Sequence, residues 1–473
     1  MNTKKLFNLL LVSFGTLVFI SCSDKEDLPD TPPANDTYIN PPAPQGYIKV
    51  EALKSCTEPF LGSGYDIMGD YLSNYSVKSP ILDLSKIDND RISYIKGASG
   101  EGDSFIGRNM KEFLLSMNQF KKFTVPTENR EDLLFTATIT NHEYFKETYD
   151  YSSQYTFAFN SSGAKIAIQR LLTLNPEWDS WLTDEFRQML DQSSPEEVVQ
   201  EFGTHVLVNV HLGYIIRTLY RSVVADNEND LLKTADTGRG ALQNTIFKYP
   251  NVSIAYPEEV AKKNYGGTIV ISFQGADYKS LPHIQLTPNA VIGDPMNITP
   301  WVKTCNEENY ALTTLSGDDL IPIYDVITDP VKKQQIKEAV IAHIKTHQLS
   351  LQQTTPIFQA TNGEYYRYYT SYKQLSENTD NCQGVIASIF TRHEPGTIPL
   401  YQSSDRGNDR LSLTPLEGGA IIGYIYESKD DKSDIIHEIS NGKSFAYTRE
   451  VKDSYSEEGT WKPTGKIFYT PKV

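Results

Sequence analysis

Two histidines in the middle of the chain, His205 and His211, are the residues whose type and spacing first suggest chemistry. A histidine can act as a general base or bind a metal, but either role needs a carboxylate, a nucleophile or further ligands beside it. No acidic residue or cysteine accompanies the pair, and no paired-carboxylate, Ser-His-Asp or Cys-His arrangement stands out elsewhere, as an envelope hydrolase would require. We therefore expect no enzymatic activity, no cofactor and no metal site. His205 is expected to be a structural residue that hydrogen-bonds across a sheet.

Cysteine chemistry is indicated at the N-terminus. Two lysines are followed by a mostly apolar run over residues 6–20, then by Ser21 and Cys22. The run is too short and too mixed for a membrane-spanning helix and is typical of a secretory signal. A small residue directly before a cysteine resembles a lipobox, which implies cleavage after Ser21 and thioether lipidation of Cys22. A plain signal peptide with an incidental cysteine is the alternative.

An acidic and then proline-rich stretch follows this cysteine. Residues 23–27 resemble the surface-export signal of Bacteroidota lipoproteins, which implies an outer-membrane protein that faces outward, or that is released or carried on vesicles. A plain solvated linker is the alternative. Residues 30–46 are rich in proline and predict a semi-extended spacer. We thus divide the N-terminus into a signal peptide over residues 1–21 and a tether over residues 22–46.

The composition is that of a folded protein with an acidic surface. Of the 473 residues, 39% are apolar and 11% aromatic, which is too many for a disordered chain. The formal net charge of -16 repels phosphate, so no nucleic acid partner is expected, and electrostatic docking onto anionic lipid is also disfavoured. Three further cysteines, Cys56, Cys305 and Cys382, match no metal-ligand spacing. In an oxidising compartment one pair can form a disulfide, and the sequence does not say which.

The best-specified elements are a helix and the strand that follows it. Ser194 can cap the helix, Pro195 suits its first turn, and Glu197 completes a capping box. The helix is expected to span residues 194–202. A long strand rich in β-branched residues is expected over residues 206–217.

A short motif lies between this helix and this strand. It consists of Phe202, Gly203, Thr204 and His205, and Gly213 follows nine residues after Thr204. This pattern resembles the signature of the membrane-attack-complex/perforin (MACPF) family of pore-forming proteins. The family usually has Tyr where this chain has Phe202, and it often has a second glycine after the position of Gly213. Gly203 would stop the helix or allow a close backbone approach.

Further segments predict elements in an order that fits the same family. Alternation of apolar and polar residues predicts strands at residues 135–140 and 155–159, the second extended by residues 164–172. An amphipathic helix is expected over residues 179–190.

Two later segments continue the resemblance, which covers about 300 residues in order. Gly266 and Gly267 precede an apolar run, as the family's Gly-Gly pair precedes its fourth strand. A set of residues nearer the C-terminus resembles the family's ending. These are Trp301, Asn309, Leu315 and residues 319–327. We place the MACPF domain at residues 47–348.

The resemblance implies an α+β fold and a mechanism. Family members, like the cholesterol-dependent cytolysins, carry a bent four-stranded antiparallel sheet flanked by two helical clusters. After ring assembly these clusters unwind into amphipathic β-hairpins that line a barrel, in which every backbone hydrogen bond is satisfied. By position, the first insert is residues 140–155 and the second is residues 223–264. Gly266 and Gly267 would be the hinge of the sheet.

The inserts support pore formation less firmly than the fold. The second insert is long enough for a spanning hairpin, whereas the first is short unless its flanking strands contribute. Pro250 and Pro257 would interrupt strand pairing in the second. A MACPF fold kept for adhesion, without pores, is therefore an alternative.

Residues 349–473 contain three loose repeats of roughly forty residues. Each runs from an apolar strand through a glycine turn to a second strand, and then to a glycine before a third. This suggests an all-β module with threefold pseudo-symmetry, trefoil-like or prism-like. Exposed tyrosines on such a module suit a glycan or another receptor, and tyrosines buried in its core are the alternative.

Together these features favour a pore-forming protein anchored on, or secreted from, a bacterial surface. The C-terminal module would bind a protein or glycan receptor on a target-cell membrane. The MACPF domain would then assemble from a monomer in solution into a homo-oligomeric ring. Resemblance to the secreted antimicrobial lipoproteins of gut Bacteroidales implies an antibacterial toxin against related strains. A non-lytic adhesin or host-contact lipoprotein is the alternative.

Overall fold

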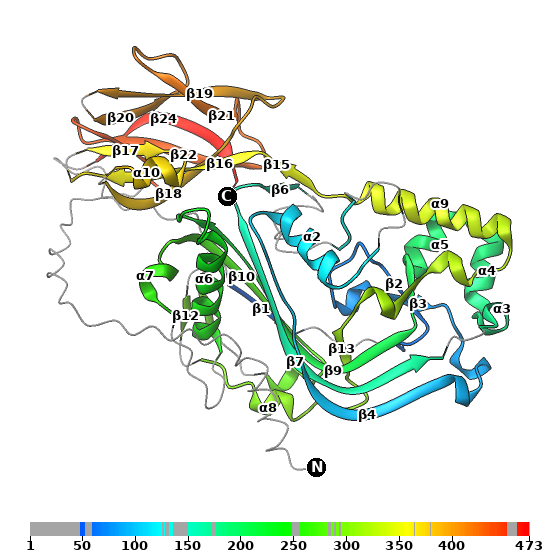
Figure 1. The fold of residues 1–473 in the computed structure, drawn as a ribbon. Helices are drawn as coiled ribbons and strands as arrows, with labels where there is room; N and C mark the ends of the chain where they lie inside the picture. The colour runs from blue at the N-terminus through cyan, green and yellow to red at the C-terminus, as the bar shows by residue number, and fades with distance from the viewer. Residues whose placement is uncertain are drawn as a thin grey trace.

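A bent antiparallel sheet organises the N-terminal part of the molecule (Figure 1). The computed structural model describes residues 48–472 apart from residues 53–58, 125–126, 128–131, 136–149, 173–175, 248–255, 282–284, 288–289, 293–294, 364, 379, 406 and 452–460. The four long strands lie in the order β10-β9-β7-β4, and each is antiparallel to its neighbour. They are β4 (Ile92–Glu101), β7 (Thr156–Leu171), β9 (Asn209–Val224) and β10 (Asn264–Gln274).

Shorter strands extend this sheet or form small sheets around it. β1 (Ile48–Ala52) pairs in parallel with β10, while β5 (Ser104–Gly107) pairs with β7 and β13 (Ala311–Thr314) with β9. A second sheet has the order β14-β8-β2-β3, with β14 (Leu320–Pro322), β8 (His205–Leu207), β2 (Ser63–Tyr65) and β3 (Val77–Pro80). Two pairs are separate: β11 (Gln285–Thr287) with β12 (Ala290–Ile292), and β6 (Asp150–Ser152) with β15 (Ser350–Gln352).

The long strands bend where two of them exchange partners. β9 pairs with β13 up to Gly213 and with β10 from Ile215 onward. β7 pairs with β5 up to Asn160 and with β4 from Gly163 onward. The register shifts at this level in both the β4–β7 and the β7–β9 pairs, and such bulges bend a strand and increase its twist. The curvature of the long strands in Figure 1 follows from these irregularities.

Gly213 lies at the bend and has no room for a side chain. A Cβ atom there would come within 1.9 Å of the carbonyl oxygen of Ala164 on β7. Gly163 and Gly275 are restricted in the same way, since their added Cβ atoms would meet the carbonyl oxygens of Tyr214 and Gly213 at 2.0 Å. The backbones approach this closely only because these positions lack a Cβ atom.

Both faces of the sheet are buried, because successive residues of β9 point to different cores. Ile215 and Leu219 belong to the larger core, whereas Ile216 and Tyr220 belong to a smaller core on the opposite face. The larger core is covered by α2 (Met110–Phe120), α3 (Trp178–Trp181), α4 (Asp184–Gln192), α5 (Pro195–Phe202) and α9 (Pro330–Thr346). The smaller core is covered by α6 (Leu231–Ile246) and α8 (Thr299–Val302), and α7 (Glu258–Ala261) packs on α6. No helix in the described ranges is long and apolar enough to cross a membrane.

An expected strand and an expected helix before residue 194 differ from the structure. The strand expected over residues 135–140 does not include Phe135, whose φ of 67° is left-handed and whose side chain is buried. Its other residues lie outside the described ranges. The helix expected over residues 179–190 is two helices, α3 and α4, because Thr183 caps a new helix by accepting from the N–H of Phe186 at 3.2 Å.

The C-terminal strands repeat one pairing pattern three times. In each unit the first strand pairs with a hairpin partner on one side and with a third strand on the other. Single residue pairs, Phe390 with Tyr424 and Tyr426 with Tyr469, join neighbouring units. The first unit is β16 (Thr354–Thr361), β17 (Tyr366–Tyr369) and β18 (Asn381–Phe390), with α10 (Tyr372–Ser376); the second is β19 (Thr397–Asp405), β20 (Asn408–Ser412) and β21 (Ala420–Tyr426); the third is β22 (Ser433–Ser440), β23 (Phe445–Thr448) and β24 (Lys462–Pro471). A threefold symmetry of these units in space stays a prediction.

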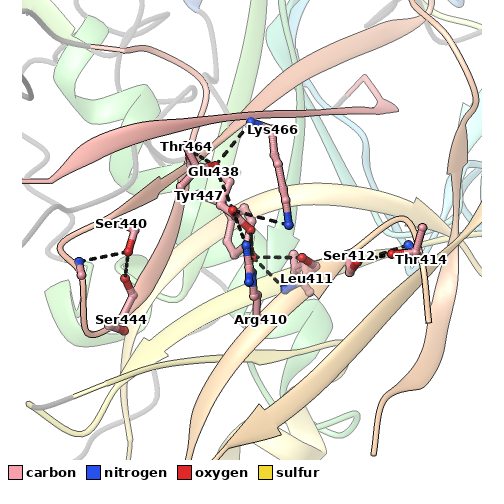
Figure 2. Close-up of polar contacts among 11 residues, drawn as sticks. Arg410, Leu411, Ser412, Thr414, Glu438, Ser440, Ser444, Tyr447, Thr464 and Lys466 are labelled. Carbon is pink, nitrogen blue, oxygen red and sulfur yellow. Dashed lines mark hydrogen bonds and ion pairs between the residues drawn. The ribbon is translucent and has the colours of Figure 1, made fainter. Parts of the chain in front are cut away.

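A buried carboxylate connects the second and third units (Figure 2). Glu438 is fully buried and accepts hydrogen bonds from the Arg410 guanidinium at 3.1 and 3.3 Å. It also accepts from the hydroxyls of Tyr447 at 3.2 Å and Thr464 at 2.8 Å, and the Lys466 ammonium lies 3.9 Å away. A buried carboxylate is tolerated only when it is paired in this way, so the network fixes the two units relative to each other.

We predict that Gly213→Ala destabilises the protein by about 2–4 kcal/mol, because the new methyl group must push β7 and β9 apart. The measurement is denaturant unfolding of the variant and the wild type. Gly97→Ala is the matched control, since Gly97 lies in β4 at the level of the bend and a Cβ atom there would meet nothing within 4 Å. Equal unfolding free energies for the two variants would contradict the close approach.

Candidate functional site

The motif of residues 202–205 joins α5 to β8. The helix begins as expected, because Ser194 Oγ accepts from the N–H of Glu197 at 3.3 Å and the Glu197 carboxylate accepts from the N–H of Ser194 at 2.8 Å. Phe202 is buried against Phe186, with ring centroids 4.9 Å apart. The helix is therefore fixed at both ends, and the motif leads from it directly into β8 of the second sheet.

Gly203 and Thr204 fasten this turn to β2. Gly203 has a φ of 74°, and a Cβ atom there would lie 2.7 Å from the carbonyl oxygen of Tyr65. Both roles expected of this glycine, helix stop and close approach, are therefore confirmed. Thr204 Oγ1 donates to that same carbonyl oxygen at 3.2 Å and accepts from the N–H of Ile67 at 3.0 Å.

His205 is buried and neutral. Its Nδ1 lies 2.9 Å from Thr204 Oγ1, and because the Thr204 proton goes to Tyr65, Nδ1 is the donor. Burial lowers the pKa of His205 to about 4. The expected side-chain hydrogen bond across the sheet is wrong, since the ring bonds to the preceding residue. Only the backbone pairs across, with Tyr65 on one side and Pro322 on the other.

His211 lies on a different strand from His205. The expected continuous strand is broken at Val208, whose N–H donates to the carbonyl oxygen of Asp319 at 3.0 Å, so β8 and β9 are separate. Contrary to the expectation, a carboxylate does accompany His211, because Asp319 Oδ1 lies 3.9 Å from its Nε2. Burial lowers the pKa of His211. Among the described residues no group of three or more His, Cys, Asp or Glu is arranged to hold a metal ion.

Gly266 and Gly267 form a bulge where the second insert rejoins the sheet. Gly266 has a φ of 61°, and the register with β9 shifts across the pair. A Cβ atom at Gly267 would lie 2.8 Å from the hydroxyl of Tyr220. The pair produces a local kink, while the main bend lies at Gly213. That the sheet pivots about Gly266 and Gly267 stays a prediction.

The second insert is a helical cluster held on the sheet by polar contacts. Asn264 Nδ2 donates to the carbonyl oxygen of Thr234 on α6 at 2.9 Å, and Ser222 Oγ donates to Asn264 Oδ1 at 2.7 Å. Asp226 accepts from Thr234 Oγ1 at 2.7 Å and pairs with Lys263 Nζ at 3.0 Å. These residues join the start of α6 to the ends of β9 and β10.

The first insert is mostly outside the described residues, but its return end is held by the C-terminal module. β6, at the end of residues 140–155, pairs in parallel with β15. The hydroxyl oxygens of Ser152 and Thr354 are 2.5 Å apart. Ser388 Oγ donates to Gln154 Oε1 at 3.2 Å.

The return end of the second insert contacts the same module. Tyr265 packs its ring on Phe358, with centroids 6.3 Å apart, and its hydroxyl donates to Cys382 Sγ at 3.3 Å. Burial raises the pKa of the Tyr265 hydroxyl above its ordinary value. These contacts were missed in the sequence, because Ser152 and Thr354 are 202 positions apart and belong to no pattern.

Four features now lie in one domain. The sheet has four long antiparallel strands, it bends at Gly213, a helical insert follows its third strand, and the motif of residues 202–205 precedes that strand. The fold is of the MACPF type. The architecture predicted from the motif is thereby confirmed.

No family model and no curated protein matches the chain. Among solved structures, a cell invasion protein with a MAC/Perforin domain from Bacteroides thetaiotaomicron is 18% identical, with a TM-score of 0.46 over 70% of this chain and 71% of its own. GNIP1Aa from Chromobacterium piscinae is 14% identical, with a TM-score of 0.46 over 89% of this chain and 95% of its own. Astrotactin-2, a vertebrate-specific perforin-like membrane protein, is 12% identical, with a TM-score of 0.26 over 61% of this chain and 100% of its own. Because these scores are low, the MACPF-type assignment rests on the strands and inserts of the chain itself.

The cysteines divide into two groups. Cys22 and Cys56 lie outside the described residues, together with the signal peptide and the tether, so lipidation of Cys22 stays a prediction. Cys305 and Cys382 are both free thiols and do not bridge to each other. Burial raises the pKa of Cys305 to about 12, which makes it unreactive at neutral pH.

We predict that replacing His205 reduces the loss of stability in acid. The pKa of His205 is about 4 in the folded state, against an ordinary value of 6.5 for an exposed histidine. The unfolded chain therefore binds the proton first, and stability falls as pH drops from 6.5 towards 4. The loss is roughly 3 kcal/mol over that interval. Denaturant unfolding at pH 7 and at pH 4.5 should show a smaller difference for His205→Asn, whose amide can still donate to Thr204.

His393→Asn is the control for this experiment, because His393 is exposed on the C-terminal module. Its acid loss should equal that of the wild type. An unchanged acid loss in His205→Asn would show that His205 is not buried as a neutral group.

Proposed function

We propose that this chain is a surface lipoprotein that binds a target-cell envelope, assembles into a ring and inserts β-hairpins, acting as a toxin against related bacteria. One arrangement carries the proposal: the return ends of both inserts lie at the same end of the bent sheet, under the C-terminal module. Since β7 and β9 are antiparallel, the start of one and the end of the other are neighbours, as Thr156 and Ser222 are. Both inserts can therefore extend the sheet in the same direction.

The length of the second insert suits this extension. A strand needs about 9–11 residues to cross a bilayer, so a hairpin needs about twenty, and residues 223–264 exceed that. In a closed barrel each new strand satisfies its backbone hydrogen bonds through its neighbours. The first insert is shorter, and β7 would have to contribute residues to its hairpin.

The C-terminal module has two roles in the proposal. It binds the receptor on the target, and until then it holds the insert ends through Thr354, Ser388 and Cys382. Receptor binding would shift the module and free the inserts. Lipidation at Cys22 would keep the protein at the outer-membrane surface before release.

A non-lytic adhesin is the second candidate. It is favoured by Pro250 and Pro257 in the second insert, since proline cannot donate to a strand ladder. In that case the module would still bind its receptor, but the inserts would stay folded.

We predict that the double variant Ser152→Cys with Thr354→Cys is inactive when oxidised. The two γ oxygens are 2.5 Å apart, close to the roughly 2 Å of a disulfide bond, so a bridge can form and fasten the first insert to the module. The oxidised variant should bind sensitive cells but neither kill them nor form rings on their outer-membrane vesicles. The measurements are viable counts and electron microscopy of those vesicles, and reduction with dithiothreitol should restore both activities.

The single variant Ser152→Cys controls for the substitution itself and should kill as the wild type does. Killing by the oxidised double variant at the wild-type level would refute release of the first insert. If the wild-type protein binds these cells but neither kills them nor forms rings, the toxin function is rejected and the adhesin function remains.

A further inference from the structure

A cavity opens in the C-terminal module between its first and second units. Its volume is about 640 Å³, within the range of small-molecule sites of about 300–1,000 Å³. β17 and α10 form one wall, and β19, β20 and the start of β21 form the other. The cavity lies away from the insert contacts of Thr354 and Cys382, which do not line it.

The floor of the cavity is a fixed polar network. Asp409 is buried, and its Oδ2 accepts from the N–H of Tyr368 at 3.0 Å and from Nε2 of Gln402 at 2.8 Å. Gln402 Nε2 also donates to the carbonyl oxygen of Tyr368 at 2.9 Å. Both partners of this amide nitrogen are acceptors, so the orientation of the amide is determined and Oε1 is left as an acceptor.

Two further amides on the wall are oriented in the same way. Gln374 Oε1 accepts from the N–H and the hydroxyl of Thr370 at 3.1 and 3.2 Å, which leaves its Nε2 as a donor. Asn378 Nδ2 donates to the carbonyl oxygen of Gln374 at 2.7 Å, which leaves its Oδ1 as an acceptor. Within the described residues these three amide atoms, on Gln374, Asn378 and Gln402, have no protein partner.

The charges of the cavity disfavour an anionic ligand. Arg367 is the one cation among its described lining residues, and it pairs with Asp380 at 3.4 Å and donates to the carbonyl oxygen of Gly407 at 3.3 Å. Two carboxylates, Glu377 and Asp409, also line the cavity. A phosphate, sulfate or sialic acid would meet no unpaired positive charge here.

An aromatic ring completes the wall. Tyr369 lines the cavity, half-buried, and its hydroxyl donates to Asp380, which fixes the plane of the ring. Ile422 adds an apolar surface on β21. A fixed ring beside oriented amide donors and acceptors suits a ligand with an apolar C–H face and a rim of neutral hydroxyls.

We propose that this cavity binds a neutral saccharide, with Tyr369 stacking on the sugar ring and Gln374, Asn378 and Gln402 hydrogen-bonding its hydroxyls. This deepens the proposed function by giving the receptor a chemical class, and it rests on that function only for the biological role of binding. The two neighbouring tyrosines would then have different roles. The Tyr368 side chain is buried and its hydroxyl donates to the carbonyl oxygen of Phe445 at 2.9 Å, whereas the half-buried Tyr369 would stack on the sugar.

The test is binding of the purified full chain to an array of immobilised neutral oligosaccharides, ending in hexose, N-acetylhexosamine or fucose, beside sialylated and sulfated ones. We expect binding to a subset of the neutral glycans and competition by the same sugar free in solution. Tyr369→Ala and the double variant Gln374→Ala with Asn378→Ala should each weaken binding about tenfold or more. Gln374 and Asn378 are exposed, so the double variant should fold normally, and its unfolding curve checks this.

Two matched controls lie outside the cavity: Ser376→Ala on α10 and Tyr401→Ala on β19 should bind as the wild type does. The proposal would be overturned if the protein bound none of the neutral glycans, if it preferred the acidic glycans, or if folded cavity variants bound as well as the wild type. Sugar binding without killing would support this site and refute the toxin. Killing without sugar binding would support the toxin function and refute this sugar site.

Discussion

The contact between the backbones of β7 and β9 at the bend is the constraint on which the rest of the structure depends. At Gly213 and Ala164 the strands are so close that a single Cβ atom would overlap a carbonyl oxygen. The sheet can therefore bend, and β7 and β9 each have a different neighbouring strand on the two sides of that level. The motif of residues 202–205 enters at one end of β9, and both inserts join the sheet at the other.

The helix of the second insert contains residues of low helix propensity and is fastened to the sheet by polar contacts. α6 contains Gly238 and Gly240, which lower helix propensity by about 1 kcal/mol each but let the helix pack closely on Asn264 and Tyr256. Its polar anchors contribute about 1 kcal/mol per hydrogen bond. β7 and β9, by contrast, bury side chains in two cores. This difference fits the proposal that the second insert opens as a unit while the sheet stays folded.

The C-terminal module has two separate surfaces, one that contacts the ends of the inserts and one that contains the polar cavity. β15 and Thr354 touch the end of the first insert, and Phe358 and Cys382 touch Tyr265 at the end of the second. The polar cavity lies between its first two units. The floor of the cavity joins the first unit to the second, since Asp409 accepts from the N–H of Tyr368. A ligand in the cavity would therefore contact the unit that also holds the insert ends.

Much of this fold could be predicted from the sequence, and the failures have physical causes. Capping residues and alternation are local signals, so α5 and β7 were predicted from the residues themselves. The helical second insert was expected only from the family resemblance. Phe135 was missed because its left-handed backbone is set by the core around it, and the break at Val208 because its partner is Asp319. The contacts between inserts and module depend on ordinary side chains brought together only by the fold.

The central claim is that α6 leaves the sheet when the protein engages its target. The most direct measurement is hydrogen–deuterium exchange of the peptides covering α6, in solution and on outer-membrane vesicles of sensitive cells. The account predicts that these peptides first lose protection on the vesicles and then regain it as strands, while β7 and β9 stay protected throughout. Unchanged exchange in α6 on vesicles that carry the bound protein would contradict it.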